Sequence, residues 1–347
     1  MSNKRLWIDE LQPGMKLAAP FVYRKRIIVD KNIILTVKII ENIKRQAETL
    51  TVLVEEDARQ KTLTSWEYAV REKYEKTVDN VREIFGSVRE TKEVPVDKIV
   101  ELASVAVNDL LKESYVLQSL KLLNSHDEYT FHHSLNVGVL CGVLGKWLKY
   151  GKDMLFLLVL SGILHDIGKA QIPLKILNKP EKLTLDEMSI MKKHTTIGFD
   201  LLKDIIQIPD EAKLATLQHH EKVDGTGYPF ALPENKISDF SKIVAVADTY
   251  DAVTSNRVYQ KARSPFMVME IFQEEMFIRL DSKICLPMLT QIKHNLVGRQ
   301  VITEDGRRAK IVFVGTQSSE DMVIETEDGE LIALNIKDYS RFKDYIG

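Results

Sequence analysis

The sequence has few cysteines and no long apolar run, and each shortage argues against a class of protein. Only Cys141 and Cys285 occur in 347 residues, far apart and outside any CxxC pattern, so neither a disulfide framework nor a zinc ribbon is indicated. The most hydrophobic window, 154–164, is much shorter than the roughly 20 residues that a spanning helix needs, and the first residues lack the apolar run of a secretory signal. We therefore expect a cytoplasmic protein without a membrane span, in which 154–164 is a buried helix.

Charge of one sign is not in excess either. The formal net charge is −2, with 28% charged and 44% hydrophobic residues. Binding to a phosphate backbone generally shows as a basic excess, so we expect no DNA or RNA polymer as the main partner. The apolar content is ample for a large core, and the length predicts two or three domains.

The pattern of apolar and turn residues changes along the chain and divides it into four segments. Residues 1–57 mix short β-rich runs with turn residues and one amphipathic stretch, which predicts a small α+β module. Residues 58–114 predict connecting helices, and 115–297 show one helical pattern after another. In 298–347 two Asp-Gly turns separate β-rich runs, which predicts a small β module. The predicted fold class is therefore mainly α, with a small module at each end.

Apolar spacing and turn residues also predict the individual elements. We expect strands at 21–23, 27–29, 50–54, 301–303, 309–314, 322–325 and 331–334. We expect helices at 37–47, 66–88, 98–112, 131–148, 155–165, 184–202, 211–220, 241–254 and 265–277.

The predicted helix at 66–88 has apolar residues at three-and-four spacing along one face. Such a face either packs against the next domain or forms a two-stranded coiled-coil seam. An amphipathic rod without an obvious covering domain tends to find a partner, so we expect a homodimer. The flanking modules also suggest a signalling-protein partner.

Histidines gather in one part of the chain. Seven of the 8 lie between His126 and His220, inside the predicted helical domain. The pairs His165-Asp166 and His219-His220 and, later, Asp248 combine imidazole with carboxylate, a donor set that suits first-row divalent metals such as iron, manganese or zinc. Each piece alone is weak evidence, because a His-Asp pair is common by chance and a lone helical histidine is more often structural.

The surroundings of these pieces strengthen the metal hypothesis. Lys169 lies three residues after Asp166, which places its ammonium on the same side of a helix, and Gly168 would let a substrate approach the backbone closely. A lone carboxylate at Asp248 would be costly in its nearly all-apolar segment unless a cation or hydrogen bonds compensate. The plain alternatives are a solvated lysine and, for the glycine-bracketed loop 221–229, a simple turn between helices.

Taken together, these motifs resemble the HD-GYP family, a branch of the HD superfamily of metal phosphohydrolases. The resemblance covers about 115–297 and rests on three motifs, HDIGK at 165–169, HHEKVDGTGYP at 219–229 and ADTYDAVTSNRVY at 247–259. It implies a helical HD-type domain that hydrolyses cyclic di-GMP to linear pGpG, GMP or both.

The resemblance also implies the residues of the site. Its metal ligands would be His133, His165, Asp166, His194, His219, His220 and Asp248. They would hold two divalent ions, iron or manganese before other metals, with Asp166 as the bridging and catalytic ligand. Lys169 would stabilise developing charge or protonate the leaving oxygen. Substrate-binding residues would be Lys169, Arg257, Lys261, Gly227, Tyr228 and Pro229.

Two departures from the family pattern concern the substrate and the number of metals. Members often read Arg-Pro-Tyr-Arg where this chain has Arg257-Val258-Tyr259-Gln260, so a second basic contact is lost unless Lys261 replaces it. Some members bind a third metal through a glutamate four residues before the first ligand histidine; here Tyr129 stands there, with Glu128 adjacent, so we expect two metals. Three histidines match no ligand position and are expected to be structural or on the surface, namely His126, His132 and His294.

Two other functions stay open. The domain could be a cyclic-dinucleotide receptor with little turnover, which Gln260 and the accessory modules favour and the complete ligand set opposes. It could also be an HD phosphohydrolase of another nucleotide, which the intact Gly227-Tyr228-Pro229 argues against by resemblance alone.

Overall fold

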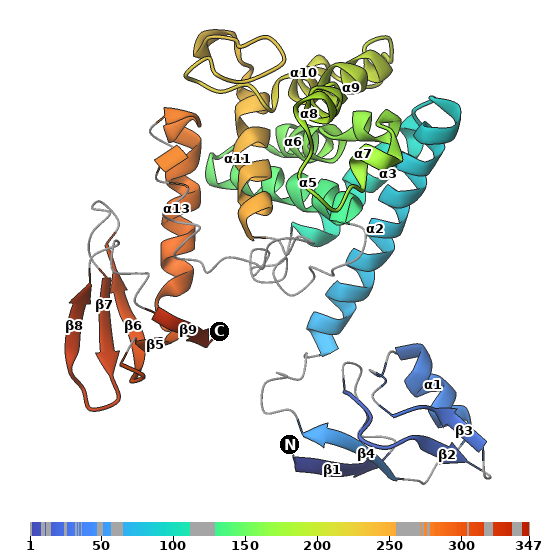
Figure 1. The fold of residues 1–347 in the computed structure, drawn as a ribbon, viewed down its shortest axis with the longest axis vertical. Helices are drawn as coiled ribbons and strands as arrows, with labels where there is room; N and C mark the ends of the chain where they lie inside the picture. Colours follow the sequence, from blue (N-terminus) through green and yellow to red (C-terminus); the bar gives the residue numbers. More distant parts are fainter. Residues whose placement is uncertain are drawn as a thin grey trace. The chain divides into compact units, whose positions relative to one another are not determined.

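The computed structural model forms two compact units, Met1–Tyr74 and Glu75–Gly347, each considered by itself (Figure 1). The residues that the structure describes are 2–7, 11, 15–23, 26–31, 33, 35, 37–46, 51–56, 65–111, 129–254, 272, 274–275, 278–303, 305–315, 322–334 and 342–346.

The first unit contains a small α+β module, as the predicted fold class has it. Its strands pair as two antiparallel ribbons, β1 (Ser2–Trp7) with β4 (Thr51–Glu56) and β2 (Phe21–Tyr23) with β3 (Arg26–Val29), and α1 spans Val37–Gln46. Leu17, Leu35 and Ile43 are fully buried in its core. The strand β1 was not predicted, because the polar sequence SNKRLW has no apolar alternation.

The long helix α2 (Ser65–Thr91) spans the boundary between the units, and its second half packs on the helical domain. Val78, Val81 and Val88 are buried within the single chain, and the Phe85 ring meets the Phe131 ring edge-on at a centroid distance of 5.7 Å. Packing against the next domain therefore explains the apolar face of this half. The apolar face that suggested a homodimer is covered in this half of α2. The homodimer stays a prediction.

The helical domain makes up most of the second unit (Figure 1). Its elements are α3 (Val96–Val105), η2 (Ala106–Leu110), α5 (Tyr129–Trp147), α6 (Lys152–Leu164), η3 (Ile167–Gln171), α7 (Leu174–Leu177), α8 (Leu185–Lys192), α9 (His194–Leu202), α10 (Asp210–Gln218), η4 (Glu234–Lys236), α11 (Asp239–Thr254) and α13 (Ser282–Leu296). The window 154–164 lies in α6, where residues from Leu158 to Leu164 are buried, as predicted. None of the helices in the described ranges is both long and apolar enough to cross a membrane.

Two glycines let the central helices α5 and α6 approach closely. A Cβ atom at Gly162 would lie 2.6 Å from the Cα atom of Gly138, closer than any real side chain allows. Gly138 follows His133 on α5, and Gly162 lies in the last turn of α6, just before His165. Small residues at this crossing therefore bring two predicted metal ligands together.

The predicted helix at 184–202 is two helices. Thr184 and Glu187 form a capping box at the start of α8, and α9 begins at His194, directly after Lys193. Lys193 keeps near-helical angles (φ −66°, ψ −11°), so the apolar spacing continues across the junction and conceals it in the sequence. The predicted helix at 265–277 falls mostly outside the described residues.

The C-terminal segment is the predicted β module, a five-stranded antiparallel sheet in the order β8-β7-β6-β5-β9. Its strands are β5 (Gln300–Thr303), β6 (Arg308–Val314), β7 (Met322–Thr326), β8 (Leu331–Leu334) and β9 (Phe342–Ile346). Gly306 and Gly329 have positive φ at the two predicted Asp-Gly turns. The buried Lys293 of α13 donates a hydrogen bond from Nζ to the Gly315 carbonyl, which ties the sheet to the last helix.

Candidate metal centre

Five helices place the seven predicted ligands at one site. His133 lies in the second turn of α5, and His165 and Asp166 follow the last turn of α6. His194 begins α9, His219 and His220 follow α10, and Asp248 lies within α11. The ligand positions are therefore mostly helix ends, where the chain turns and two consecutive side chains can face one cavity.

One half of the site contains His133, His165 and Asp166. The Nε2 atoms of the two histidines are 3.3 Å apart, and Asp166 Oδ2 lies 3.4 Å from the first and 3.2 Å from the second. Asp248 adds an oxygen 3.2 Å from His133 Nε2. The first three side chains are almost fully buried.

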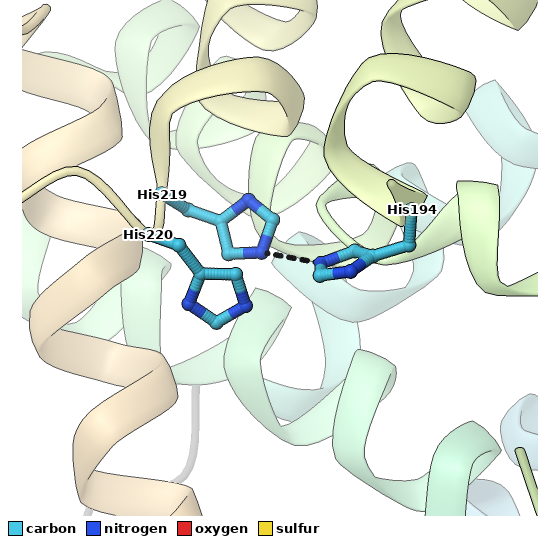
Figure 2. Close-up of side chains that lie close together, drawn as sticks. All are labelled: His194, His219 and His220. Carbon is cyan, nitrogen blue, oxygen red and sulfur yellow. Dashed lines mark hydrogen bonds between the residues drawn. The ribbon is translucent and has the colours of Figure 1, made fainter. Parts of the chain in front are cut away.

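The other half contains His194, His219 and His220, whose rings converge in Figure 2. The Nε2 atoms of His194 and His219 are 3.3 Å apart. Asp166 Oδ1 lies 3.3 Å from His194 Nε2 and 3.9 Å from His219 Nε2. The two oxygens of Asp166 therefore face different halves of the site.

Hydrogen bonds behind the rings determine which nitrogen faces inward. His165 Nδ1 lies 2.7 Å from the Gly162 carbonyl, His194 Nδ1 lies 2.8 Å from the Met191 carbonyl, and His219 Nδ1 lies 3.0 Å from the Thr216 carbonyl. A carbonyl only accepts, so each Nδ1 carries a proton, and Nε2 is the nitrogen that faces the site, with its lone pair when the ring is neutral.

The site therefore gathers acceptors that lack donors. Asp166 Oδ1 is buried and has no hydrogen-bond partner among the described residues. Facing lone pairs at 3.2–3.4 Å repel one another unless a cation lies between them. Ligands at about 2.0–2.1 Å from a first-row ion lie roughly 3.0–3.4 Å from each other, so the observed spacing fits metal ions.

The protonation states also suit metal binding. Burial lowers the pKa of His194 to about 4 and that of His220 to about 3, and it holds the pKa of His219 well below its usual range. Burial alone would raise the pKa of Asp166, but the neighbouring His165 and Lys169 and hydrogen bonds from histidines hold it well below its usual value. Near pH 7 His194, His219 and His220 are therefore neutral and Asp166 is charged, which are the forms that bind metals.

Lys169 lies beside the predicted metal ligands, as its spacing from Asp166 predicts. Its Nζ atom is 2.5 Å from Asp166 Oδ2, and a fifth of its side chain is exposed. Gly168 has a different role from the predicted one. A Cβ atom there would lie 1.9 Å from the His194 carbonyl oxygen, so the close approach is made by the backbone of α9 and not by a substrate.

The loop that carries Gly227, Tyr228 and Pro229 folds back onto the site. A Cβ atom at Gly227 would lie 2.4 Å from the Glu221 Cα atom, so only glycine fits. The Tyr228 ring stacks on the His220 ring at a centroid distance of 4.7 Å. The loop is therefore more than a simple turn, because it covers one of the predicted ligands.

Buried groups that the sequence reasoning missed support this arrangement. The Glu221 carboxylate accepts hydrogen bonds from the Phe230 and Leu232 amides at 2.7 and 2.9 Å, and so holds the loop. Asp251 contacts His133. Asp251 lies three residues after Asp248 on one helix, so the two share a helix face. That spacing alone does not distinguish Asp251 from a surface carboxylate.

The remaining predicted residues have mixed outcomes. Arg257, Gln260 and Lys261, together with His126, lie outside the described residues, so the substrate contacts assigned to the first three stay predictions. His132 is buried, with Nε2 3.5 Å from a Glu75 carboxylate oxygen, and His294 is exposed, in agreement with structural and surface roles.

Comparison with known proteins finds a family model and relatives that match the part of the chain containing this site. Residues 118–284 match the family model described as HD domain. The chain is 41% identical over 152 residues to a cyclic di-GMP phosphodiesterase of Pseudomonas aeruginosa, covering 44% of this chain and 37% of the relative. It is 35% identical over 172 residues to 3′3′-cGAMP-specific phosphodiesterase 1 of Vibrio cholerae, covering 49% of this chain and 40% of the relative. The chain thus spans well under half the length of either relative.

A solved structure shares the fold. An HDG"Y"P protein from Bdellovibrio bacteriovorus aligns with a TM-score of 0.57 and 16% identity, covering 84% of this chain and 100% of that one. The HD domain match, the relatives and the site motifs agree with one another. Residues 118–284 therefore match an HD domain, and the motifs in this segment resemble those of the HD-GYP family.

Proposed function

We propose that this chain is a metal-dependent phosphodiesterase that hydrolyses cyclic di-GMP to linear pGpG, GMP or both. The observation that carries the proposal is the position of Asp166, whose two buried oxygens face two separate groups of histidine nitrogens. A carboxylate in that position suits a bridge between two cations. Binuclear centres are a common solution for cleaving phosphodiester bonds.

The chain's own residues fit two divalent ions. His133, His165 and Asp248 would hold one, His194, His219 and His220 the other, and Asp166 would bridge them. Imidazole and carboxylate donors without thiolate suit first-row divalent metals, among which the family resemblance favours iron or manganese. When bound, such ions supply a water nucleophile at neutral pH and neutralise phosphate oxygens.

Lys169 and the covering loop would act on the substrate itself. The partly exposed Lys169 ammonium would stabilise charge on the phosphate, or donate a proton to the oxygen that leaves when the P–O bond breaks. Gly227, Tyr228 and Pro229, with Arg257 and Lys261, would bind the dinucleotide. One hydrolysis opens the ring to pGpG, and a second releases GMP.

A direct assay tests the proposal. Purified chain would be loaded with Fe²⁺ or Mn²⁺ under anaerobic conditions and incubated with cyclic di-GMP and, separately, with 3′3′-cGAMP, which a relative's name also suggests as substrate. We expect linear dinucleotide or GMP by chromatography and about two metal ions per chain. Asp166→Ala should abolish turnover and most metal binding, whereas Asp239→Asn, an exposed change on α11, should alter neither.

The assay also separates the alternative function. A receptor would bind the dinucleotide tightly without forming product, and Gln260 in place of a family arginine is the feature that favours it. Turnover by Asp166→Ala at the wild-type rate would reject the metal assignment altogether.

Further proposals concern the whole chain. We propose the four segments 1–57, 58–114, 115–297 and 298–347 as its domains, a cytoplasmic location and a homodimer. Two buried free cysteines agree with a reducing compartment. Light scattering on the purified chain measures the oligomeric state, and the terminal modules are the parts available to a signalling partner.

A further inference from the structure

His133 has a carboxylate against each of its ring nitrogens. Nε2 faces Asp166 and Asp248 at 3.4 and 3.2 Å, and Nδ1 lies 2.7 Å from Asp251 Oδ2. The Asp251 side chain is buried, and its other oxygen accepts a hydrogen bond of 2.8 Å from Asn136 Nδ2. Both oxygens of Asp251 are therefore engaged, and the carboxylate is fixed behind the ring.

The other histidines with a described Nδ1 contact differ in one respect. His165, His194 and His219 each donate from Nδ1 to a neutral backbone carbonyl. A carbonyl fixes the tautomer, but a carboxylate also places a full negative charge behind the ring and makes Nε2 a stronger donor to a metal. Among these four rings, His133 is the one whose described Nδ1 partner is a carboxylate.

The surrounding charges extend the same asymmetry. The half with His133 and His165 has Asp166 and Asp248 within 3.4 Å of its nitrogens, and Asp251 adds a third carboxylate. The half with His194 and His219 has Asp166 alone at 3.3 Å, and Asp248 reaches only to 3.9 Å from His220 Nδ1. The Lys169 ammonium contacts Asp166 Oδ2 and offsets part of this charge, but Asp248 and Asp251 remain, so a divalent cation is attracted more strongly to the first half.

We propose that Asp251 is a positioning residue that makes the His133 half the tighter of two unequal metal sites, so that the chain fills this half first and the three-histidine half second. The inference rests on the proposed binuclear centre. It assigns Asp251 no contact with metal or substrate, since its oxygens are taken by His133 and Asn136.

Stepwise metal binding tests the proposal. Metal-free chain would be titrated with Co²⁺, monitored by visible absorption and by competition with a chelator of known affinity. We expect two separable affinities in the wild type. Asp251→Asn keeps the shape and an acceptor but removes the charge, and it should weaken the tighter step by about 10- to 100-fold while leaving the weaker step unchanged. Asp251→Glu should restore part of the loss.

Controls separate this effect from a general loss of structure. Asp239→Asn removes one charge from an exposed position on the same helix and should leave both steps unchanged. Asn136→Ala leaves the Asp251 charge but frees its orientation, so it should weaken the tighter step by less than Asp251→Asn. If Asp251→Asn does not fold in metal-free buffer, Asn136→Ala carries the test.

The outcomes are distinct. Wild-type affinities at both steps in Asp251→Asn, or in Asn136→Ala where that variant carries the test, would overturn the proposal and leave the binuclear centre intact. Equal weakening of both steps would also overturn it. A wild-type chain that binds fewer than two ions would reject the binuclear centre and, with it, this inference.

Discussion

Lys169 is the cation nearest to Asp166, and its removal should affect catalysis more than metal binding. The ammonium contacts Asp166 Oδ2, which is one of several polar contacts that the carboxylate makes in the site. We expect Lys169→Met to lower kcat on cyclic di-GMP by about 10²- to 10⁴-fold, the usual contribution of a general acid, with metal content close to wild type. Elemental analysis beside the kinetic assay distinguishes the two effects.

A lysine of similar spacing provides the control. Lys203 pairs with Asp200 three residues earlier on an exposed surface, so Lys203→Met removes an equivalent contact away from the site. It should leave kcat unchanged. Loss of metal in Lys169→Met in proportion to the loss of kcat would show that the lysine holds the ligands and does not act on the substrate.

The buried histidines predict a pH dependence of the metal-free chain. The pKa of His194 is lowered by burial to about 4 and that of His220 to about 3, whereas histidine in an unfolded chain titrates near 6.5. Between about pH 6.5 and 4 the unfolded chain binds protons that the folded chain does not, so stability falls as the pH is lowered. Thermal unfolding in a chelator should give a Tm that decreases over this range.

A variant tests whether these rings cause the decrease. His194→Gln removes one of the three rings whose pKa burial lowers, and we expect a shallower loss of Tm between pH 6.5 and 4.5 than in the wild type. A Tm that does not change over this range in the metal-free wild type would contradict the prediction.

At the scale of elements, α2 is connected directly to the turn that carries Lys169. Arg89 donates hydrogen bonds of 3.1 Å to the carbonyls of Lys169 and Ile172, and Gln171 Nε2 donates to the Val88 carbonyl at 2.6 Å. These hydrogen bonds fix the backbone of η3 against the end of α2. A small displacement of a catalytic group costs up to about 10²-fold in rate, so this contact would affect catalysis if Lys169 has its proposed role.

We expect Arg89→Ala to lower kcat about 10-fold or more without changing metal content. Arg89→Lys should recover little, because one ammonium does not reproduce the two-pronged guanidinium contact. Glu90→Ala, an exposed change at the next residue of α2, is the matched control. Kinetics with wild-type kcat in Arg89→Ala would show that η3 holds its position without α2.

The fold class and most helices were predictable because apolar spacing reports burial directly. The junction between α8 and α9 was hidden, since Lys193 keeps helical spacing while the second helix begins at His194. The seven candidate ligands were predicted from motif resemblance, because no local rule connects His133 to Asp248 across the chain. Asp251 and Glu221 were missed, since a buried carboxylate is recognised only from the groups that surround it.

At the scale of the whole molecule, the centre joins segments distant in sequence. It draws side chains from α5, α9 and α11 and from the ends of α6 and α10, so it crosslinks the helical domain from residue 133 to residue 248. Without metal, the same groups are a buried set of acceptors, including an Asp166 oxygen without a partner among the described residues. A ligand that binds only the folded state stabilises it by mass action, so metal occupancy and stability are linked.

We therefore expect chelation to lower the Tm of the metal-loaded chain. Each site occupied at a hundredfold excess over its Kd adds about 2.7 kcal/mol, and about 2–4 °C accompany each kcal/mol in a domain of this size, so the decrease should be on the order of 10 °C. Re-addition of Mn²⁺ should restore the Tm, whereas Ca²⁺ should not, because the nitrogen-rich donor set is unsuited to it. In Asp166→Ala, which lacks the carboxylate between the two halves, the Tm should respond weakly to either treatment. An equal response of Asp166→Ala and wild type would place the stabilising metal elsewhere in the chain.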